Sequence, residues 1–99
     1  MKNHTKIFIK YFNIGQDEMI LCEYCKTNYT NQVHHIDRRG MGGSKKKDVI
    51  QNLMGLCLDP CHELAEAEKL DEEMLWEIHK QNLKPEDRID YKNREKLFK

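Results

Sequence analysis

Four cysteines in two close pairs are the first residues of this chain whose types and spacing could do chemistry. The pairs are Cys22-x2-Cys25 and Cys57-x3-Cys61. Two cysteines separated by two residues on a turn can direct both sulfurs to one tetrahedral Zn²⁺, and a second pair completes a four-sulfur site. Bound zinc lowers the thiol pKa, so all four cysteines would bind as thiolates. We therefore expect a structural zinc site here.

Two other interpretations of the cysteines stay open on spacing alone. Cys57 could be a buried core residue, or Cys22 and Cys25 could form a redox pair. The redox reading requires a thioredoxin-like βαβ context, which the sequence does not present. The apolar run Ile7–Ile9 is broken at Lys10, too early for an export signal. We expect a cytoplasmic location, where metal binding is favoured over disulfide formation.

A second set of candidate residues combines histidines with a carboxylate. His34 and His35 are adjacent, so on a strand their side chains point to opposite faces. His62 and Glu66 are four residues apart, which places them on one face of a helix. Packed together, His34, His62 and Glu66 could surround one cation, and these ligands suit Mg²⁺, Mn²⁺, Ni²⁺ or Zn²⁺. The neighbouring histidine could then face a reacting water.

Three further polar residues are less informative. Asn52 is either a turn residue or a side chain that bridges the backbone of the preceding loop. His4 lies in what we expect to be a flexible start, and we assign it no role. His79 follows Leu75 and Ile78 on a predicted helix, where we expect it at the surface or at the edge of the core, with a distant ligand role left open.

The elements that must position these residues are short. Residues 6–12 fit either a helical face or a strand. The runs 33–36 and 52–57 predict two strands, and the glycine-rich stretch 39–48 predicts a long loop between them. Asp59-Pro60 and Asp71 are helix-start signals, which predict helices over 60–69 and from 72 to about 82. Lys84-Pro85 ends the second helix. The tail 86–99 is either a docked helix or partly frayed.

The amino-acid composition limits the class of protein to which this chain can belong. The chain has 99 residues, 34% charged residues and a mean hydropathy of −0.88, which indicates one domain and excludes a membrane protein. The net charge is zero, but charge is unevenly distributed. A basic stretch without acids holds Arg38, Arg39, Lys45, Lys46 and Lys47, whereas residues 59–77 hold eight acids and one base. These stretches are either two solvated faces, or the basic stretch forms a local basic patch despite the zero net charge.

The order of these motifs strongly resembles the HNH endonucleases, in particular the compact zinc-stapled members found in phages and mobile elements. The likeness rests on the two cysteine pairs, Val33-His34-His35-Ile36, Asn52-Leu53 and Cys61-His62, and on Arg39-Gly40-Met41-Gly42-Gly43. It spans residues 22–66. It implies an α+β fold with a ββα-metal (His-Me finger) core: two antiparallel strands, a long loop and a crossing helix. We expect residues 1–99 to form a single HNH nuclease domain, with an N-terminal element and a C-terminal helical extension over 71–99.

The resemblance also implies roles for particular residues. His35 resembles the general base, His34 the first metal ligand, and His62 the third motif histidine. Asn52 resembles the middle motif residue, which braces the loop or helps to place the metal. We also expect Arg39 to take part in catalysis. Glu66 stands where many members have a second helical histidine, and Cys57 and Cys61 are separated by three residues instead of two.

The implied activity is metal-dependent hydrolysis of a DNA phosphodiester, leaving 5′-phosphate and 3′-hydroxyl ends. The cofactors would be a structural Zn²⁺ and one catalytic divalent cation. Arg38, Arg39, Lys45, Lys46 and Lys47 would contact DNA phosphates. A phage or host protein could supply target specificity, and a phage-encoded chain would act in the host cytoplasm. Two alternatives are a non-catalytic zinc-stapled DNA-binding module and a zinc-knuckle adaptor that binds protein through its acidic helices.

Overall fold

The first element is a helix that packs its apolar face on the rest of the molecule. The computed structural model describes residues 2–15, 18–30, 32–37, 45–57, 61, 64 and 70–98. Helix α1 spans Asn3–Tyr11, so the ambiguous segment is helical and the start of the chain is ordered. Beyond the C-cap Phe12, Asn13 adopts a left-handed φ of 55°, and the next N–H, that of Ile14, donates to the carbonyl of Ile9.

Two antiparallel strand pairs follow. Strands β3 (Val33–His35) and β4 (Leu53–Gly55) pair with Val33 opposite Gly55 and His35 opposite Leu53. Both strands lie within the segments predicted from the sequence. A second pair, β1 (Ile20–Leu21) with β2 (Tyr29–Thr30), is an unexpected addition. Ile20 on β1 lies so close to Gly55 that a Cβ there would meet its side chain at 2.6 Å, so this position requires glycine.

The described part of the expected long loop contains one 3-10 turn, and a second 3-10 turn follows the loop. These are η1 (Lys45–Lys47) and η2 (Ile50–Asn52), the second of which leads directly into β4. Residues 38–44 lie outside the described part of the chain. The loop prediction over 39–48 is therefore wrong at 45–47, where the chain forms a 3-10 turn.

The C-terminal third is helical and docked. Helix α3 spans Glu72–Lys80, and its predicted N-cap is confirmed because the Asp71 side chain accepts from the N–H of Glu73. The chain continues through two 3-10 segments, η4 (Pro85–Asp87) and η5 (Tyr91–Phe98). The Trp76 indole donates to the Ile89 carbonyl at 2.7 Å, which ties the tail to α3. The tail is therefore docked as 3-10 helix. The helix expected over 60–69 lies outside the described residues, apart from Cys61 and Leu64.

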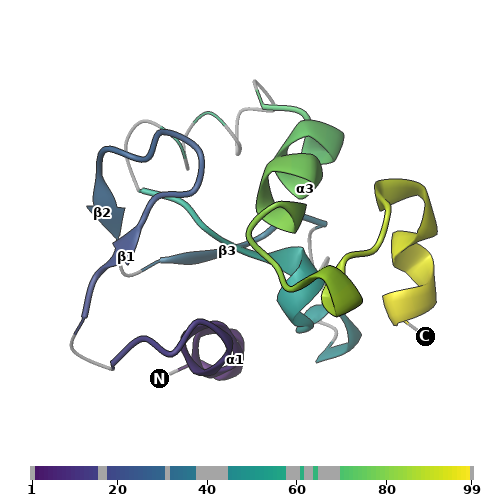
Figure 1. The fold of residues 1–99 in the computed structure, drawn as a ribbon, viewed down its shortest axis with the longest axis horizontal. Helices are drawn as coiled ribbons and strands as arrows, with labels where there is room; N and C mark the ends of the chain where they lie inside the picture. The colour runs from purple at the N-terminus through teal and green to yellow at the C-terminus, as the bar shows by residue number, and fades with distance from the viewer. Residues whose placement is uncertain are drawn as a thin grey trace.

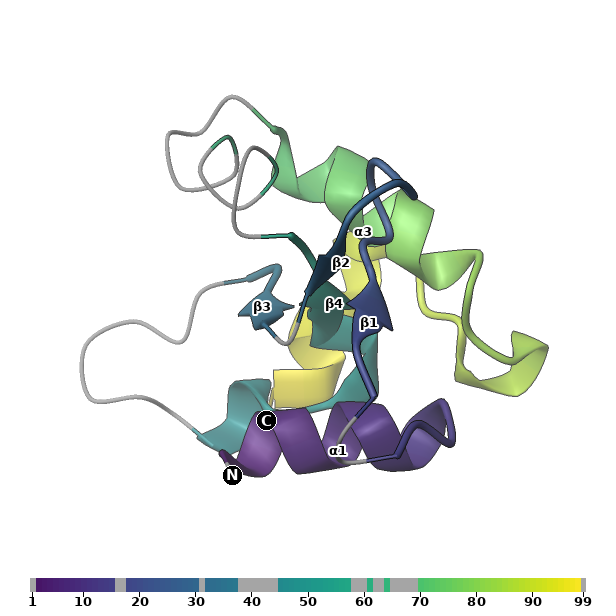
Figure 2. The ribbon, with the colours of Figure 1, turned by 90° about the vertical axis from the view of Figure 1, so that its left-hand side faces the viewer.

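The elements enclose two apolar clusters that meet at β4. One cluster joins α1 to the strands through Phe8, Ile20, Val33 and Leu53. The other joins the cysteines to α3 and includes Met54, Leu56, Leu75 and Trp76. Figure 1 shows α3 on the opposite side of the strands from α1. Figure 2 shows the N-terminal end of α1 beside the 3-10 segment that follows the loop. Among the described residues, no helix is long and apolar enough to span a membrane.

Candidate active site and zinc knuckle

The four cysteines come together at one point of the fold. Their sulfur atoms all lie within 4.8 Å of one another, and none of the cysteines is in a disulfide. Cys22, Cys57 and Cys61 are buried, and Cys25 is half-buried. Four sulfurs at this spacing match the donor set of a tetrahedral structural zinc site. The fold therefore brings both pairs together despite the longer spacing of the second.

The turn at the first pair favours thiolates. Lys26 adopts a left-handed φ of 56°, and its N–H donates to the Cys22 carbonyl at 3.0 Å. The backbone N–H groups of Asn28 and Thr27 face the Cys25 sulfur and lower its pKa to about 6. Burial has the opposite effect on Cys61 and raises the pKa of that thiol. A bound cation is what would hold four such sulfurs as thiolates in one cluster.

The second candidate centre lies at the end of β3. The Nε2 atom of His35 lies 2.7 Å from the Oδ1 atom of Asp48, and their side chains are 13% and 3% exposed. Asp48 follows η1, so the β3–β4 connection returns to the end of β3 at this pair. A buried carboxylate that bonds one ring nitrogen fixes both the orientation and the tautomer of an imidazole. Sequence reasoning missed Asp48, although it is the first acid after the basic stretch.

Helix α1 contributes two side chains to this centre. The imidazole of His4 packs edge-on against that of His35, with ring centroids 4.6 Å apart. The Asn3 amide donates to the second carboxylate oxygen of Asp48 at 3.3 Å. The expectation that His4 lies in a flexible start was therefore wrong. No local sequence signal could have found this contact, because His4 and His35 meet only through the packing of α1.

Asn52 braces the loop between the two strands. Its Oδ1 atom accepts from the N–H of Asp37 at 2.7 Å, and its Nδ2 atom donates to the carbonyls of Asp37 and Lys47 at 3.0 and 3.1 Å. The side chain is completely buried. One amide thus joins both ends of the loop, which agrees with the bridging role among the sequence-based alternatives.

The other predicted site residues are distributed as follows. His34 is buried on β3 opposite Met54. Lys46 is exposed, whereas the Lys47 ammonium lies 2.7 Å from Asp37 Oδ1 and above the Phe98 ring. The Lys47 charge is therefore engaged within the protein. The η1 turn includes Lys45. Arg38, Arg39, His62 and Glu66 lie outside the described residues.

A buried network joins the cysteine turn to α3. His79 Nδ1 lies 2.6 Å from Glu23 Oε1, and its Nε2 donates to the Ile50 carbonyl at 2.7 Å. The Gly55 N–H and the Asn82 amide also donate to the Glu23 carboxylate. His79 is fully buried, so its expected place at the surface or core edge was wrong.

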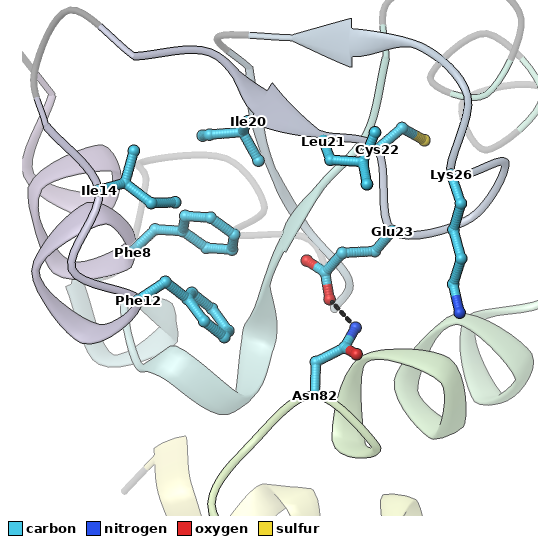
Figure 3. Close-up of a pocket in the computed structure, with 9 residues that line it drawn as sticks. All are labelled: Phe8, Phe12, Ile14, Ile20, Leu21, Cys22, Glu23, Lys26 and Asn82. Atoms are coloured by element: carbon cyan, nitrogen blue, oxygen red, sulfur yellow. Dashed lines mark hydrogen bonds between the residues drawn. The ribbon is translucent and has the colours of Figure 1, made fainter.

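An apolar pocket of about 390 Å³ borders the same network. Figure 3 shows Phe8, Phe12 and Ile14 on one side of this pocket, with Glu23 bonded to Asn82 on the other. The pocket lies against β1 and shares no lining residue with the His35 centre. Its apolar wall belongs to the cluster that fixes α1 to the strands.

Small sheets, helices and a clustered four-cysteine site define a mixed α+β protein with a site consistent with bound zinc. Residues 22–68 match the family model described as HNH endonuclease. This segment of the chain is therefore an HNH endonuclease domain. Comparisons with curated proteins and with solved structures gave no significant match.

Proposed function

We propose that the protein is a metal-dependent DNA endonuclease that hydrolyses phosphodiester bonds with His35 as general base. The HNH endonuclease match implies nuclease activity on DNA. The observation that carries the proposal is the 2.7 Å contact between His35 Nε2 and Asp48 Oδ1. An ionised carboxylate only accepts hydrogen bonds, so in the neutral imidazole that a general base requires, Nε2 carries the proton and Nδ1 keeps the lone pair. Nδ1 is then the atom that takes a proton from water.

The proposed catalytic cation would be held by His34, His62 and Glu66. Imidazole and carboxylate donors fit Mg²⁺, Mn²⁺, Ni²⁺ or Zn²⁺. When bound, the cation supplies Lewis-acid stabilisation of charge on the phosphate and the leaving oxygen. His34 and His35 are neighbours on β3, so their side chains leave opposite faces and serve different tasks. Because both polar atoms of the Asn52 amide bond the loop backbone, we assign Asn52 to bracing rather than to metal binding.

DNA binding in this proposal depends on the basic stretch. Arg38, Arg39, Lys45 and Lys46 would contact phosphates on either side of the scissile bond, with Arg39 nearest the chemistry. Such contacts position the duplex without reading its sequence. Lys47 plays a different part, since its ammonium pairs with Asp37. Target specificity would come from a phage or host partner protein.

The flanking elements belong to the same domain in our proposal. Helix α1 contacts β3, β4 and η2, and it brings Asn3 to the Asp48 carboxylate. The C-terminal segment η5 contacts η1, and Arg94 Nε donates to Asp37 Oδ2 at 3.1 Å. Elements outside the HNH segment thus contact the residues around His35, which supports one domain over 1–99.

The test is cleavage of supercoiled plasmid across Mg²⁺, Mn²⁺, Ni²⁺ and Zn²⁺. His35→Ala should bind the cation and DNA normally and lose cleavage by a factor on the order of 10²–10⁴. His34→Ala should first show weaker cation binding, partly restored by excess metal. If excess metal restored cleavage by His35→Ala but not by His34→Ala, the two roles would be reversed.

The same assays separate the alternatives. Salt-sensitive DNA binding without metal-dependent cleavage would indicate a non-catalytic DNA-binding module. Absence of both would indicate a protein-binding adaptor. Cleavage that survives both histidine substitutions would place the active site elsewhere.

A further inference from the structure

Three potential metal ligands meet around the carboxylate of Asp48. The ligand atoms of His4, His35 and Asp48 all lie within 4.8 Å of one another. They come from three separate parts of the chain: α1, β3 and the residue after η1. Asp48 is buried and the His35 side chain is 13% exposed, so the cluster reaches the edge of the protein at His35.

The chemistry of this cluster is that of a transition-metal site. Two imidazoles and one carboxylate form a donor set that binds Zn²⁺ and neighbouring divalent metals and leaves positions open for water. The Asn3 amide holds the other carboxylate oxygen of Asp48 at 3.3 Å, which orients the ligand as second-layer contacts do in metalloproteins. None of these three ligands belongs to the set proposed for the catalytic cation.

We propose that His4, His35 and Asp48 bind Zn²⁺ and that this binding switches off the general base. The inhibitory effect rests on the proposed function of His35, whereas the metal site itself does not. Zinc would enter between Nε2 of His35 and Oδ1 of Asp48, in place of the hydrogen atom that now joins them. His4 supplies the third ligand from α1.

The proton on His35 accounts for the switch. Without metal at this site, Nε2 carries the proton and Nδ1 carries the lone pair. A neutral imidazole that binds a metal through one nitrogen carries its proton on the other. Zinc at Nε2 therefore moves the proton to Nδ1, with no net release from His35. The atom that must accept a proton from water then no longer has a lone pair to offer.

Metal binding is tested in protein that already holds one Zn²⁺ at the cysteines. The His34→Ala background removes the proposed catalytic metal site. A calorimetric titration with Zn²⁺ then measures the affinity of the site formed by His4, His35 and Asp48. Adding His4→Ala should weaken this binding at least about tenfold. His4→Gln serves as a second variant if alanine disturbs α1, and Lys6→Ala, an exposed position on the same helix, is the matched control. Equal Zn²⁺ affinity with and without the His4 substitutions would overturn the site.

Nuclear magnetic resonance of the histidine side-chain nitrogens gives an independent readout. Zn²⁺ should shift Nε2 of His35 as a metal-bound nitrogen and convert Nδ1 to a protonated one. An unchanged His35 ring on addition of Zn²⁺ would also overturn the site, whatever the affinity.

Cleavage of plasmid at fixed Mg²⁺ tests the switch. Rising Zn²⁺ should inhibit cleavage by the native protein. The Zn²⁺ concentration that halves cleavage should be at least about tenfold higher for His4→Ala. Equal inhibition of both proteins would overturn the proposed inhibition through His35. The calorimetric and resonance measurements would still decide whether the metal site exists. If no metal supports cleavage, the proposed function fails, and calorimetry and resonance shifts still decide whether the site exists.

Discussion

The carboxylate of Glu23 and the imidazole of His79 lie 2.6 Å apart in the interior, and they join the cysteine turn to helix α3. Glu23 follows the first zinc-site cysteine, and its N–H donates to the Gly55 carbonyl on β4. The pair thus connects three parts of the domain at a point with little solvent. Removing one partner from such a pair leaves the other buried with unmet hydrogen bonds.

We expect Glu23→Gln to lower the free energy of unfolding by about 1–3 kcal/mol, because its amide offers one acceptor oxygen where the donors of His79, Gly55 and Asn82 now share two. Chemical denaturation monitored by Trp76 fluorescence measures the change. Glu77→Gln is the control, because Glu77 bonds Lys80 on the outside of the same helix and is 45% exposed. Equal stability of the two variants would contradict a structural role for the buried pair.

The cysteine cluster should hold one tightly bound Zn²⁺ per chain in protein purified without added zinc. Cys25→Ser should release this zinc and unfold the domain, since structural zinc contributes directly to folding. Metal analysis and far-ultraviolet circular dichroism measure both effects. Met19→Ser, at an exposed position before β1, is the control. A metal-free protein that stays fully folded would contradict this prediction.

Asp48→Ala should slow single-turnover cleavage on the order of 10²-fold or more, because the carboxylate that fixes the His35 tautomer is lost. Asp48→Asn should also be slow, since an amide beside Nε2 can donate as well as accept and so no longer fixes the tautomer. Nitrogen chemical shifts of His35 should show mixed tautomers in the alanine variant, a readout that a merely structural role would leave unchanged. Asp90→Ala, an exposed carboxylate bonded to Lys80, is the control.

Asn52→Ala should lower the free energy of unfolding by about 2–4 kcal/mol, because three buried hydrogen bonds are lost together. Hydrogen exchange at the Asp37 amide should accelerate in the same variant. Gln51→Ala, which removes a single hydrogen bond to the Asp87 carbonyl, should cost markedly less. If hydrogen exchange at the Asp37 amide stayed slow in Asn52→Ala, the bracing role of Asn52 would be contradicted.

Substitutions of Lys46 and Lys47, the two residues of the basic stretch whose side chains the structure describes, should have different effects. Lys46→Ala should weaken DNA binding and reduce the slope of its salt dependence by about 0.9, as expected for one phosphate contact. Lys47→Ala should instead lower stability, since its ammonium bonds Asp37 and covers Phe98. DNA affinity across a salt series and thermal melting separate the two effects. An unchanged salt slope in Lys46→Ala would make that residue ordinary surface.

Local sequence patterns were sufficient to predict the features that depend on the residues of one short segment. The apolar runs predicted β3 and β4, and Asp71 predicted the start of α3. The paired spacing of the cysteines predicted that four sulfurs would converge. Asn52 could be narrowed to two roles because amides that follow a loop commonly bond its backbone.

The remaining features depend on contacts between distant segments. Asp48 and His4 reach His35 through the β3–β4 connection and the packing of α1, which no periodicity encodes. His79 is polar, so its position on α3 suggested an exposed face, but Glu23 and the Ile50 carbonyl satisfy both of its nitrogens in the interior. Strands β1 and β2 are too short to produce an alternating pattern.

The Asn52 amide that fastens Asp37 to Lys47 also has a consequence for redesign of the protein. The entropy of closing a loop grows only slowly with its length, so the difficult requirement is that its ends meet correctly. Here that requirement is met by the Asn52 side chain at the base of β4, together with the ion pair between Lys47 and Asp37. The tract between the two anchors can accordingly diverge in length and composition without disturbing the scaffold. This makes it a suitable place for engineers to graft foreign recognition segments.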